Sequence, residues 1–464
     1  MKYSKLRSIY ENSPNWIKSL TRIVPFKYLA GKSYRQTMRE IQWFDTASRN
    51  DILARQSDML GDILKYAVEY VPAYQPYKSA VDKYKPFDAL KEFPFLDKKT
   101  VSENIDKFLS IEKDRMKWYL TTTGGTTGNP LRIYLDNDSH YIETAFIHSQ
   151  WKRVGFLPSM RKATFRGVKL DRIKVDEDVY WQTNPVYNEI QYSPYHISNE
   201  TIPLYFQNLL KQRPGFLHGY PSAIDLIAKW VIRNNKVGKL SVKSALLGSE
   251  AINKGQKERI ELAFACRVYT WYGHSERVIL AGECEKETVY HAFPNYGFLE
   301  IIDNNGIDCK SGDFGEIVGT GLNNYIMPII RFKTDDYAIR AETHCPSCKR
   351  NWDLLTNVEG RREQNVIIGK NSEEISISSL SMNGYGPLFD NVIRYQYVQI
   401  IQGECYLNLM VTPLFSDKDK IALQNIYNHK VMDTLDIIIR VVDDIPLTER
   451  GKVKILVSNI TSDQ

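Results

Sequence analysis

The chain has 464 residues, of which 43% are hydrophobic and 25% charged, and its formal net charge is +6. This composition excludes a disordered chain, and charges of both signs are interspersed, which argues against a nucleic-acid partner. No apolar run approaches the ~18 residues of a membrane-spanning helix, and no signal peptide is recognisable. We therefore predict a cytoplasmic protein of about two or three domains. In that compartment, its cysteines are expected to be thiols or metal ligands instead of disulfides.

The N-terminal region is predicted to be helical. Apolar residues recur at helical spacing over residues 16–24 and over residues 52–71, and the two patterns end at Pro25 and Pro72. We expect the first segment to pack on the rest of the protein. Peripheral contact with a membrane surface is the alternative, because basic residues lie beside its apolar positions.

Residues 119–136 read YLTTTGGTTGNPLRIYLD, a threonine- and glycine-rich run between two strand-like segments. Burial of apolar groups cannot stabilise such a run, so a ligand is the expected source of its order. Its backbone N–H groups and threonine hydroxyls would offer a donor surface to phosphate oxygens; a flexible turn is the alternative. A Walker loop is disfavoured because Gly128 precedes Asn129 instead of lysine. Further along, Asp138 is predicted to cap a helix.

Strand and helix patterns alternate in the middle of the chain. Residues 215–235 and 243–252 each open with a strand pattern, and residues 266–276 form a strand rich in β-branched and aromatic residues that runs into a loop. Repeated strand, helix, strand units predict a mainly parallel, layered α/β core. Ligands of such sheets bind at the carboxyl ends of the strands, where the segments GSE and YGHSE lie.

The last third of the chain has a different pattern. Short strands separated by turns predict an antiparallel subdomain at about 285–345, and three further strand patterns follow a charged turn at 358–365. The predicted fold class is therefore α/β. It consists of a large layered N-terminal domain with mixed sheets and an antiparallel subdomain, followed by a small α+β C-terminal domain.

The run TTGGTTGNP resembles the nucleotide phosphate loop of the adenylate-forming superfamily, which includes the acyl-CoA synthetases. Other segments resemble further motifs of this superfamily and follow in its order: GSEAI (248–252), WYGHSE (271–276), GEIVGTGLNNYIMPIIRFKTDD (315–336), GRRE (360–363) and PLTERGKVK (446–454). Ordered matches are far more specific than any single one. The wording NYIMPIIRF is most similar to the phenylacetate-CoA ligase branch, especially its capsular-polysaccharide-biosynthesis group.

This resemblance implies a role for each motif residue. The residues that would cradle the phosphates of ATP are Thr122, Thr123, Gly124, Gly125, Thr126, Thr127 and Gly128. The other nucleotide contacts would come from Ser249, Glu250, Tyr272, Gly273, Ser275, Asp336 and Arg361. Within this second set, Tyr272 would lie against the adenine, Ser275 would reach the α-phosphate and Asp336 would accept the ribose hydroxyls. The adenine-contacting strand end is the segment that contains Ser249 and Glu250.

Three of the matched residues are the expected catalytic ones. By the resemblance, Glu276 helps to hold Mg²⁺, a hard cation that prefers oxygen ligands. Lys452 would bridge the carboxylate and the α-phosphate oxygens, and Thr127 belongs to the phosphate loop.

The implied division of the chain is a helical region at 1–110, a nucleotide-binding core at 111–360 and a mobile C-terminal lid domain at 361–464.

The implied reaction is Mg²⁺- and ATP-dependent adenylation of a small carboxylic acid, followed by acyl transfer to coenzyme A or a carrier thiol. The subgroup implies a role in capsule or surface polysaccharide biosynthesis. Two alternatives stay open: acyl transfer to a sugar amine or hydroxyl, and a non-catalytic nucleotide-binding component of a glycan assembly complex.

The chain departs from the family pattern at Leu131, where lysine is common, at Asp335, where glycine is common, and at Glu363, where the hinge often has aspartate.

A second set of residues has metal-ligand spacing. Cys345 and Cys348 form a CxxC pair, and Cys284 and His291 lie upstream. Together they predict a tetrahedral Zn²⁺ site of three thiolates and one imidazole, and the phenylacetate-CoA ligase branch has comparable clusters. Four protein ligands would leave no open position, so its role would be structural. The alternative is an ordinary turn with cysteines and an unrelated histidine in a strand.

Overall fold

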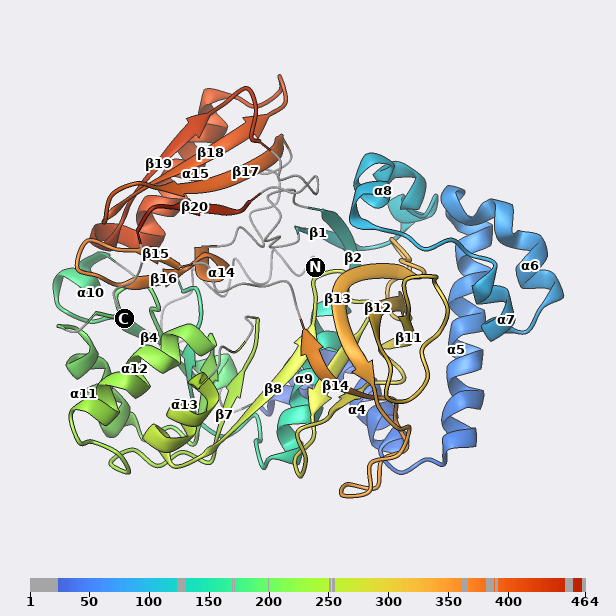
Figure 1. The fold of residues 1–464 in the computed structure, drawn as a ribbon, viewed down its shortest axis with the longest axis horizontal. Helices are drawn as coiled ribbons and strands as arrows, with labels where there is room; N and C mark the ends of the chain where they lie inside the picture. The colour runs from blue at the N-terminus through green and yellow to red at the C-terminus, as the bar shows by residue number, and fades with distance from the viewer. Residues whose placement is uncertain are drawn as a thin grey trace. The chain divides into compact units, whose positions relative to one another are not determined.

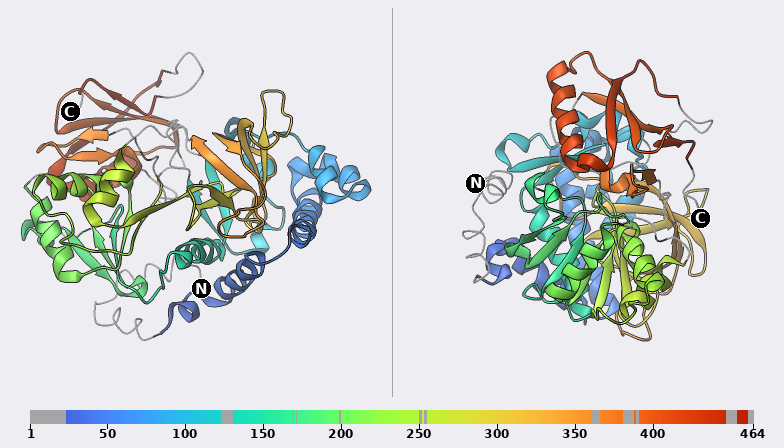
Figure 2. Two further views of the ribbon diagram at one scale, coloured as in Figure 1. Left: turned by 60° about the horizontal axis from the view of Figure 1, so that its bottom comes forward. Right: turned by 90° about the vertical axis from the view of Figure 1, so that its left-hand side faces the viewer.

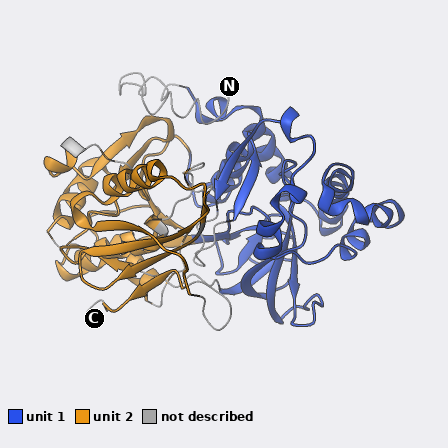
Figure 3. Cartoon of the chain, turned by 90° about the horizontal axis from the view of Figure 1, so that it is seen from above, with its two compact units in different colours: residues 1–123, 131–157, 270–361 blue, residues 124–130, 158–269, 362–464 orange. Residues whose placement is uncertain are grey.

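The structure is a computed structural model that describes residues 24–122, 131–168, 170, 172–198, 200–249, 252, 255–359, 366–380, 388, 391–446 and 454–460. The chain forms two compact units, shown in separate colours in Figure 3. Unit 1 is drawn from residues 1–123, 131–157 and 270–361, and unit 2 from residues 124–130, 158–269 and 362–464. Figure 1 labels their elements.

The N-terminal part of unit 1 is helical, as predicted. Its helices are α3 (Phe26–Leu29), α4 (Gly31–Phe44), α5 (Arg49–Tyr70), η2 (Pro72–Tyr77), α6 (Lys78–Lys83), α7 (Pro86–Lys91), α8 (Lys98–Glu103), η3 (Ile105–Phe108), η4 (Lys113–Arg115) and α9 (Ser139–Arg153). The Ser48 side chain caps α5 by accepting the N–H of Asp51, and Val71 ends the helix in an extended conformation before Pro72. Of the amphipathic segment predicted over residues 16–24, only Val24 is among the described residues.

One predicted cap is wrong. Asp138 stands immediately before α9, but its side chain makes no capping hydrogen bond. Its Oδ2 atom accepts a hydrogen bond from the hydroxyl of Ser33 at 2.6 Å, so the carboxylate is used in a tertiary contact with α4. Local capping preference is weak enough, at about 1 kcal/mol, for one such contact to override it.

The strands of unit 1 are antiparallel. They are β1 (Trp118–Thr122), β2 (Arg132–Asp136), the end of β8 (Arg267–Gly273), β9 (Leu280–Glu283), β10 (Tyr290–Ala292), β11 (Gly297–Ile302), β12 (Phe314–Gly321), β13 (Phe332–Arg340) and β14 (Leu354–Glu359). The larger sheet has the order β11-β12-β13-β14-β10-β9-β8, and β1 pairs with β2. Apolar side chains of α5 pack with those of β9, β11 and β12 into one core. The prediction of an antiparallel subdomain is confirmed.

Unit 2 contains the predicted parallel sheet. Its strands are β3 (Lys162–Phe165), β4 (Trp181–Asn184), β5 (Glu189–Tyr192), β6 (Phe216–Gly219) and β7 (Ser244–Leu247). Its helices here are α10 (Arg172–Asp176), η5 (Pro185–Tyr187), α11 (Ile202–Gln212), α12 (Pro221–Arg233) and α13 (Gln256–Phe264). The strand order is β7-β6-β3-β5-β4, in which only the edge strand β4 is antiparallel. Apolar faces of α11, α12 and α13 complete its core.

The C-terminal part of unit 2 is an α+β arrangement. Its elements are β15 (Val366–Ile368), β16 (Glu374–Ser376), α14 (Ile377–Leu380), β17 (Val392–Gln399), β18 (Glu404–Val411), α15 (Asp417–Val431), η7 (Met432–Thr434), β19 (Asp436–Val441) and β20 (Leu456–Ser458). A four-stranded sheet has the order β19-β18-β17-β20, and α15 packs against one of its faces (Figure 2). The fold class is thus confirmed, whereas the predicted domain boundaries and the mobility of the C-terminal domain remain predictions.

None of the described helices is both long enough and apolar enough to cross a membrane.

Candidate active site and metal centre

Two of the predicted motifs meet through one hydrogen bond. Tyr272 lies near the end of β8 and Asp336 lies in β13. The Tyr272 hydroxyl donates to Asp336 Oδ2 at 3.0 Å. The antiparallel sheet brings these residues together, although 64 positions separate them in the chain. Tyr272 and Asp336 therefore lie in contact, as their predicted roles at the adenine and the ribose require.

Because an aspartate also stands at position 335, where glycine is common in the family, the sequence alone does not decide whether Asp335 or Asp336 faces the nucleotide. The structure separates them, because a β-bulge interrupts the pairing of β12 with β13 here and Asp335 has a left-handed φ of 64°. Asp336 points to Tyr272, and its N–H donates to Thr334 Oγ1 at 3.2 Å. The N–H of Asp335 instead donates to Glu316 Oε1 at 3.3 Å. Asp336 is therefore the better candidate for the ribose.

Glu276 offers a largely buried carboxylate on the loop that follows β8. Its side chain is 12% exposed, and its Oε2 atom lies 3.4 Å from Nδ1 of His274. Burial alone would raise the pKa of Glu276, but His274 and the ammonium group of Lys98 hold it below the usual value. Glu276 is thus ionised at neutral pH. A buried, ionised oxygen ligand fits the Mg²⁺ role that the sequence predicts.

Lys98 is a charged residue of this site that sequence reasoning missed. It begins α8, after Asp97, whose side chain caps the helix by accepting the N–H of Thr100 at 2.7 Å. The ammonium group interacts with the carboxylates of Glu276 and Asp335, which oppose the lowering of the Lys98 pKa by burial. Lys98 therefore supplies positive charge to the site, although Leu131 stands where the family often has a lysine.

The position of Lys98 depends on a backbone contact that no sequence motif predicts. Leu96 forms an isolated parallel bridge with Phe332. The N–H of Leu96 donates to Arg331 O at 2.9 Å, and the N–H of Lys333 donates to Leu96 O at 2.8 Å. This short pairing lays the segment before α8 along the start of β13. It therefore brings Lys98 to Asp335.

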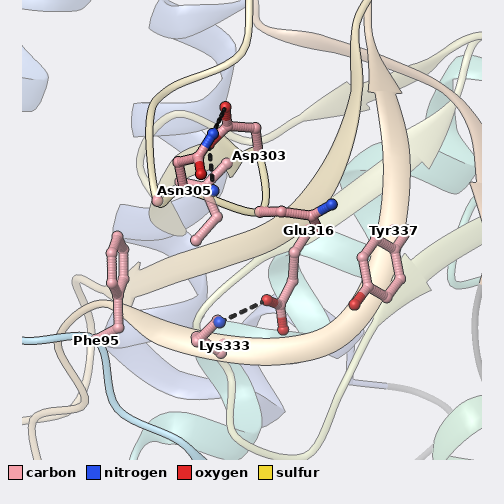
Figure 4. Close-up of a pocket in the computed structure, with 9 residues that line it drawn as sticks. Phe95, Asp303, Asn305, Glu316, Lys333 and Tyr337 are labelled. Atoms are coloured by element: carbon pink, nitrogen blue, oxygen red, sulfur yellow. Dashed lines mark hydrogen bonds and ion pairs between the residues drawn. The ribbon is translucent and has the colours of Figure 1, made fainter.

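A shallow cavity of about 350 Å³ opens on the neighbouring surface of unit 1. Figure 4 shows Phe95, Glu316, Lys333 and Tyr337 around it, with the ammonium group of Lys333 2.9 Å from Glu316 Oε2. Glu316 also accepts the N–H of Asp335, so its two carboxylate oxygens hold the cavity wall and the bulge together.

Within unit 2, the carboxyl ends of neighbouring parallel strands meet as expected. Ser249 follows β7 and has a left-handed φ of 71°. Arg166, after β3, donates to the Ser249 hydroxyl, and its guanidinium group lies 5.5 Å from the ring centroid of Tyr220, which follows β6. The contact between Arg166 and Ser249 was not predicted, because neither residue stands near the other in the sequence.

Several predicted site residues lie outside the described part of the chain. They are Thr123, Gly124, Gly125, Thr126, Thr127, Gly128, Glu250, Arg361 and Lys452. Their roles stay predictions, as do those of Gly273 and Ser275, which lie between Tyr272 and Glu276. Thr122 is described, and it is the buried last residue of β1. The strands β1 and β2 flank the predicted phosphate loop on both sides.

The predicted metal ligands converge in unit 1. One potential ligand atom from each of Cys284, His291, Cys345 and Cys348 lies within 4.8 Å of the other three. Cys284 follows β9, His291 is in β10, and the CxxC turn joins β13 to β14. The histidine and the three cysteines thus lie together in the structure, whereas the binding of a metal stays a prediction. Three thiols and an imidazole in this grouping fit tetrahedral Zn²⁺.

Local interactions prepare this cluster for a cation. The N–H of Lys286 donates to the Cys284 sulfur at 3.4 Å, and Cys348 Sγ lies 3.5 Å from His291 Nε2. Burial, reinforced by Arg153 and Arg350, lowers the pKa of His291 to about 3. Its imidazole is consequently neutral at physiological pH, the form that binds metals.

A largely buried charge network surrounds the cluster of cysteines and histidine. Arg350 donates to both carboxylate oxygens of Glu285 at 2.9 Å and to Asp45 Oδ1 at 2.9 Å. Arg153, at the end of α9, donates to the same Asp45 oxygen at 2.9 Å. Burial would raise the pKa of Glu285, but the hydrogen bonds from Arg350 hold it at about 2. The network connects the cluster to Asp45, which follows α4.

Comparisons with known proteins agree with this arrangement. The family model described as the CapK C-terminal domain matches residues 367–459. The chain is 24% identical to Protein CapK of Staphylococcus aureus over 98% of this chain and 100% of that protein. It is 23% identical to the phenylacetate-coenzyme A ligase of Escherichia coli K12 over 72% of this chain and 76% of that protein.

The fold also has a solved counterpart. The crystal structure of 2-hydroxyisobutyryl-CoA ligase in complex with 2-HIB-AMP and CoA superposes with a TM-score of 0.54 at 15% identity, covering 90% of this chain and 91% of that one. The chain therefore has the fold of this acyl-CoA ligase. Its sequence is CapK-like and similar to the phenylacetate-CoA ligases, in agreement with the predicted resemblance to the adenylate-forming superfamily.

Proposed function

We propose that the protein is a Mg²⁺- and ATP-dependent ligase that adenylates a small carboxylic acid and then transfers the acyl group to coenzyme A or a carrier thiol. Its relation to the phenylacetate-CoA ligases supports this class of enzyme. The hydrogen bond between Tyr272 and Asp336, which joins two of the predicted motifs, is the observation that carries the proposal.

The chemistry requires two anions, the carboxylate and the α-phosphate, to meet while pyrophosphate leaves. Oriented cations and donors lower that barrier by stabilising the charge that gathers in the transition state. Asp336 binds the ribose, Glu276 holds Mg²⁺, and Lys98 adds a cation beside Glu276. Bound Mg²⁺ would neutralise phosphate charge. Thr127 and the other residues of the phosphate loop would hold the leaving pyrophosphate.

The second half of the reaction and its setting are proposed from the resemblance. The predicted similarity to the capsular-polysaccharide-biosynthesis group, together with similarity to Protein CapK over 98% of this chain, supports a role in capsule or surface polysaccharide biosynthesis. The thiol acceptor is favoured because the phenylacetate relatives are named as coenzyme A ligases. A sugar amine or hydroxyl is the competing acceptor, and the amphipathic N-terminal segment would serve any peripheral membrane contact.

The proposal is tested with purified protein, ATP, labelled pyrophosphate and a panel of carboxylic acids. Exchange of label into ATP that depends on one acid is the expected result, and mass spectrometry should find the matching acyl-AMP. Products formed with coenzyme A or with nucleotide sugars then identify the acceptor. ATP binding without acid-dependent exchange or AMP release, across a broad panel, would favour the non-catalytic component instead.

Replacing Lys98 by methionine should weaken Mg·ATP binding, because the substitution removes a cation beside Glu276 while keeping a similar side-chain length. A charge-assisted contact is worth ~1.5 kcal/mol or more, so the dissociation constant should rise about tenfold. Calorimetric titration with a non-hydrolysable ATP analogue measures this. Lys99→Met is the matched control, because Lys99 is the next residue of the same helix and its side chain is exposed. Its ammonium group lies 4.0 Å from the carboxylate of Glu103, not from a predicted site residue. Equal affinities in the two variants would remove Lys98 from the site.

We further propose that Cys284, His291, Cys345 and Cys348 bind one structural Zn²⁺. The donor set and its convergence support a closed, four-ligand site.

A further inference from the structure

The imidazole of His274 is a buried polar group that the fold itself does not use. Its side chain is 8% exposed, and neither Nδ1 nor Nε2 forms a hydrogen bond with any residue that the structure describes. Buried polar atoms are normally paired, because an unpaired one loses its hydration without compensation. His274 therefore offers a binding group for a ligand.

The backbone around His274 is fixed on both sides. Gly273, the last residue of β8, pairs with Leu280 of β9, and a Cβ atom on Gly273 would lie 2.9 Å from Leu280 Cδ1. On the other side, His274 O accepts the N–H of Arg277 at 3.2 Å. The Arg277 side chain is held by α9, since its Nη1 atom donates to Ser139 O at 2.6 Å. The loop thus presents the imidazole in a defined place within unit 1.

The neighbours of His274 decide which nitrogen atom faces a ligand. Nδ1 lies 3.4 Å from Glu276 Oε2, in ion-pair contact but outside hydrogen-bond geometry, and the ring packs edge-on against Tyr272 with 5.7 Å between the centroids. A proton on Nδ1 would face this carboxylate favourably, whereas a bare Nδ1 would turn its lone pair against the carboxylate oxygen. We therefore assign the proton to Nδ1. In the neutral ring, Nε2 is then an acceptor that requires a donor.

The donor groups of the nucleotide have other predicted partners. The ribose hydroxyls are assigned to Asp336, and the adenine to the strand end that contains Ser249 and Glu250. The acid is the remaining reactant of the adenylation step. Its carboxylate must approach the α-phosphate, which Ser275, the residue after His274, is predicted to reach.

We propose that Nε2 of His274 accepts a hydrogen bond from the acid, and that the preferred substrate carries a neutral donor, a hydroxyl or an amide N–H, in addition to its carboxylate. An ammonium group fits less well, because its charge would compete with Mg²⁺ for Glu276. The inference rests on the proposed function and deepens it by naming a class of acid.

The test compares acids that differ in one donor group. The pairs are butyrate with the hydroxybutyrates and phenylacetate with mandelate and the hydroxyphenylacetates, and N-acetylglycine represents the amides. Values of kcat/KM come from pyrophosphate exchange by the full-length protein. The fastest acid should carry a donor and exceed its unsubstituted analogue about tenfold or more, since that analogue leaves a buried acceptor unpaired.

Two variants assign this preference to the imidazole. His274→Phe keeps a ring against Tyr272 and removes both nitrogen atoms, so the preference should disappear. His274→Gln offers an amide oxygen and should retain part of it. The ligand-free His274→Phe protein should melt at the native temperature or above, because nitrogen atoms without protein partners do not stabilise the fold. His429→Phe, half-buried in α15, is the control and should keep the preference.

The possible results separate the inference from the proposed function. A fastest acid without a donor group, or an unchanged preference in His274→Phe, would overturn the inference. So would an equal loss of exchange with both members of a pair together with a raised KM for ATP, because it would assign the imidazole to the nucleotide. A markedly lower melting temperature of His274→Phe would show a structural role instead. Exchange with none of the acids would overturn the proposed function itself.

Discussion

Lys452→Ala is expected to reduce acid-dependent pyrophosphate exchange by a factor of about 10² to 10³ or more, while ATP binding changes little. The predicted role of Lys452 is to place an ammonium group where the carboxylate and the α-phosphate oxygens meet. Such a contact matters most in the transition state, when the two anions are closest. The loss should therefore fall on kcat, not on the affinity for ATP.

Lys454→Ala is the matched control for this prediction. Lys454 lies two residues further along the same segment, and its side chain is exposed. Its removal takes away the same charge from the same stretch of chain and should leave exchange near the native rate. Initial rates of exchange at saturating ATP and acid measure both variants. If Lys452→Ala exchanges as fast as Lys454→Ala, the catalytic assignment of Lys452 is wrong.

Cys345→Ser is expected to abolish stoichiometric Zn²⁺ binding and to destabilise unit 1 by roughly 4 kcal/mol or more. The cluster joins three separate segments: the turn after β9, the strand β10 and the turn before β14. Without a metal, three thiols and a neutral imidazole remain packed together with no cation between them. Metal analysis of the purified protein and thermal unfolding with and without a chelator measure both effects.

Cys266→Ser controls for the general effect of replacing a cysteine. Cys266 lies outside the cluster and is half-buried, so its replacement should leave the metal content at one Zn²⁺ per chain. A native protein that contains no zinc and resists chelators would contradict the proposed metal. Equal loss of stability in the two serine variants would show that the cluster has no special structural role.

Much of the fold could be predicted because its signals are local. The apolar period of α5 and its proline boundary lie in one stretch of sequence, and the strands β6, β7 and β8 are bounded by recognisable turns. The convergence of Cys284, His291, Cys345 and Cys348 could also be predicted, since their spacing is typical of metal ligands. Tyr272 and Asp336 were found through motif order, which stands in for the tertiary contact that the structure shows.

Lys98 and Arg166 could not be predicted in the same way. Lys98 stands 178 positions from Glu276, and its place depends on the parallel bridge between Leu96 and Phe332. Arg166 meets Ser249 only because parallel strands bring their carboxyl ends together. Neither residue has a local pattern that distinguishes it from a solvated lysine or arginine. Asp138 illustrates the converse, because a favourable capping position was used for a distant partner.

The shared carboxylate of Asp45 makes the N-terminal helices an integral part of unit 1. Arg153 and Arg350 both donate to this one carboxylate, which follows α4 directly. A truncated protein that lacked α4 and Asp45 would leave Arg153 without this partner and Arg350 with Glu285 alone, next to the cluster of Cys284, His291, Cys345 and Cys348. Trimming these helices to ease crystallisation or expression is therefore expected to destabilise residues far away in the sequence.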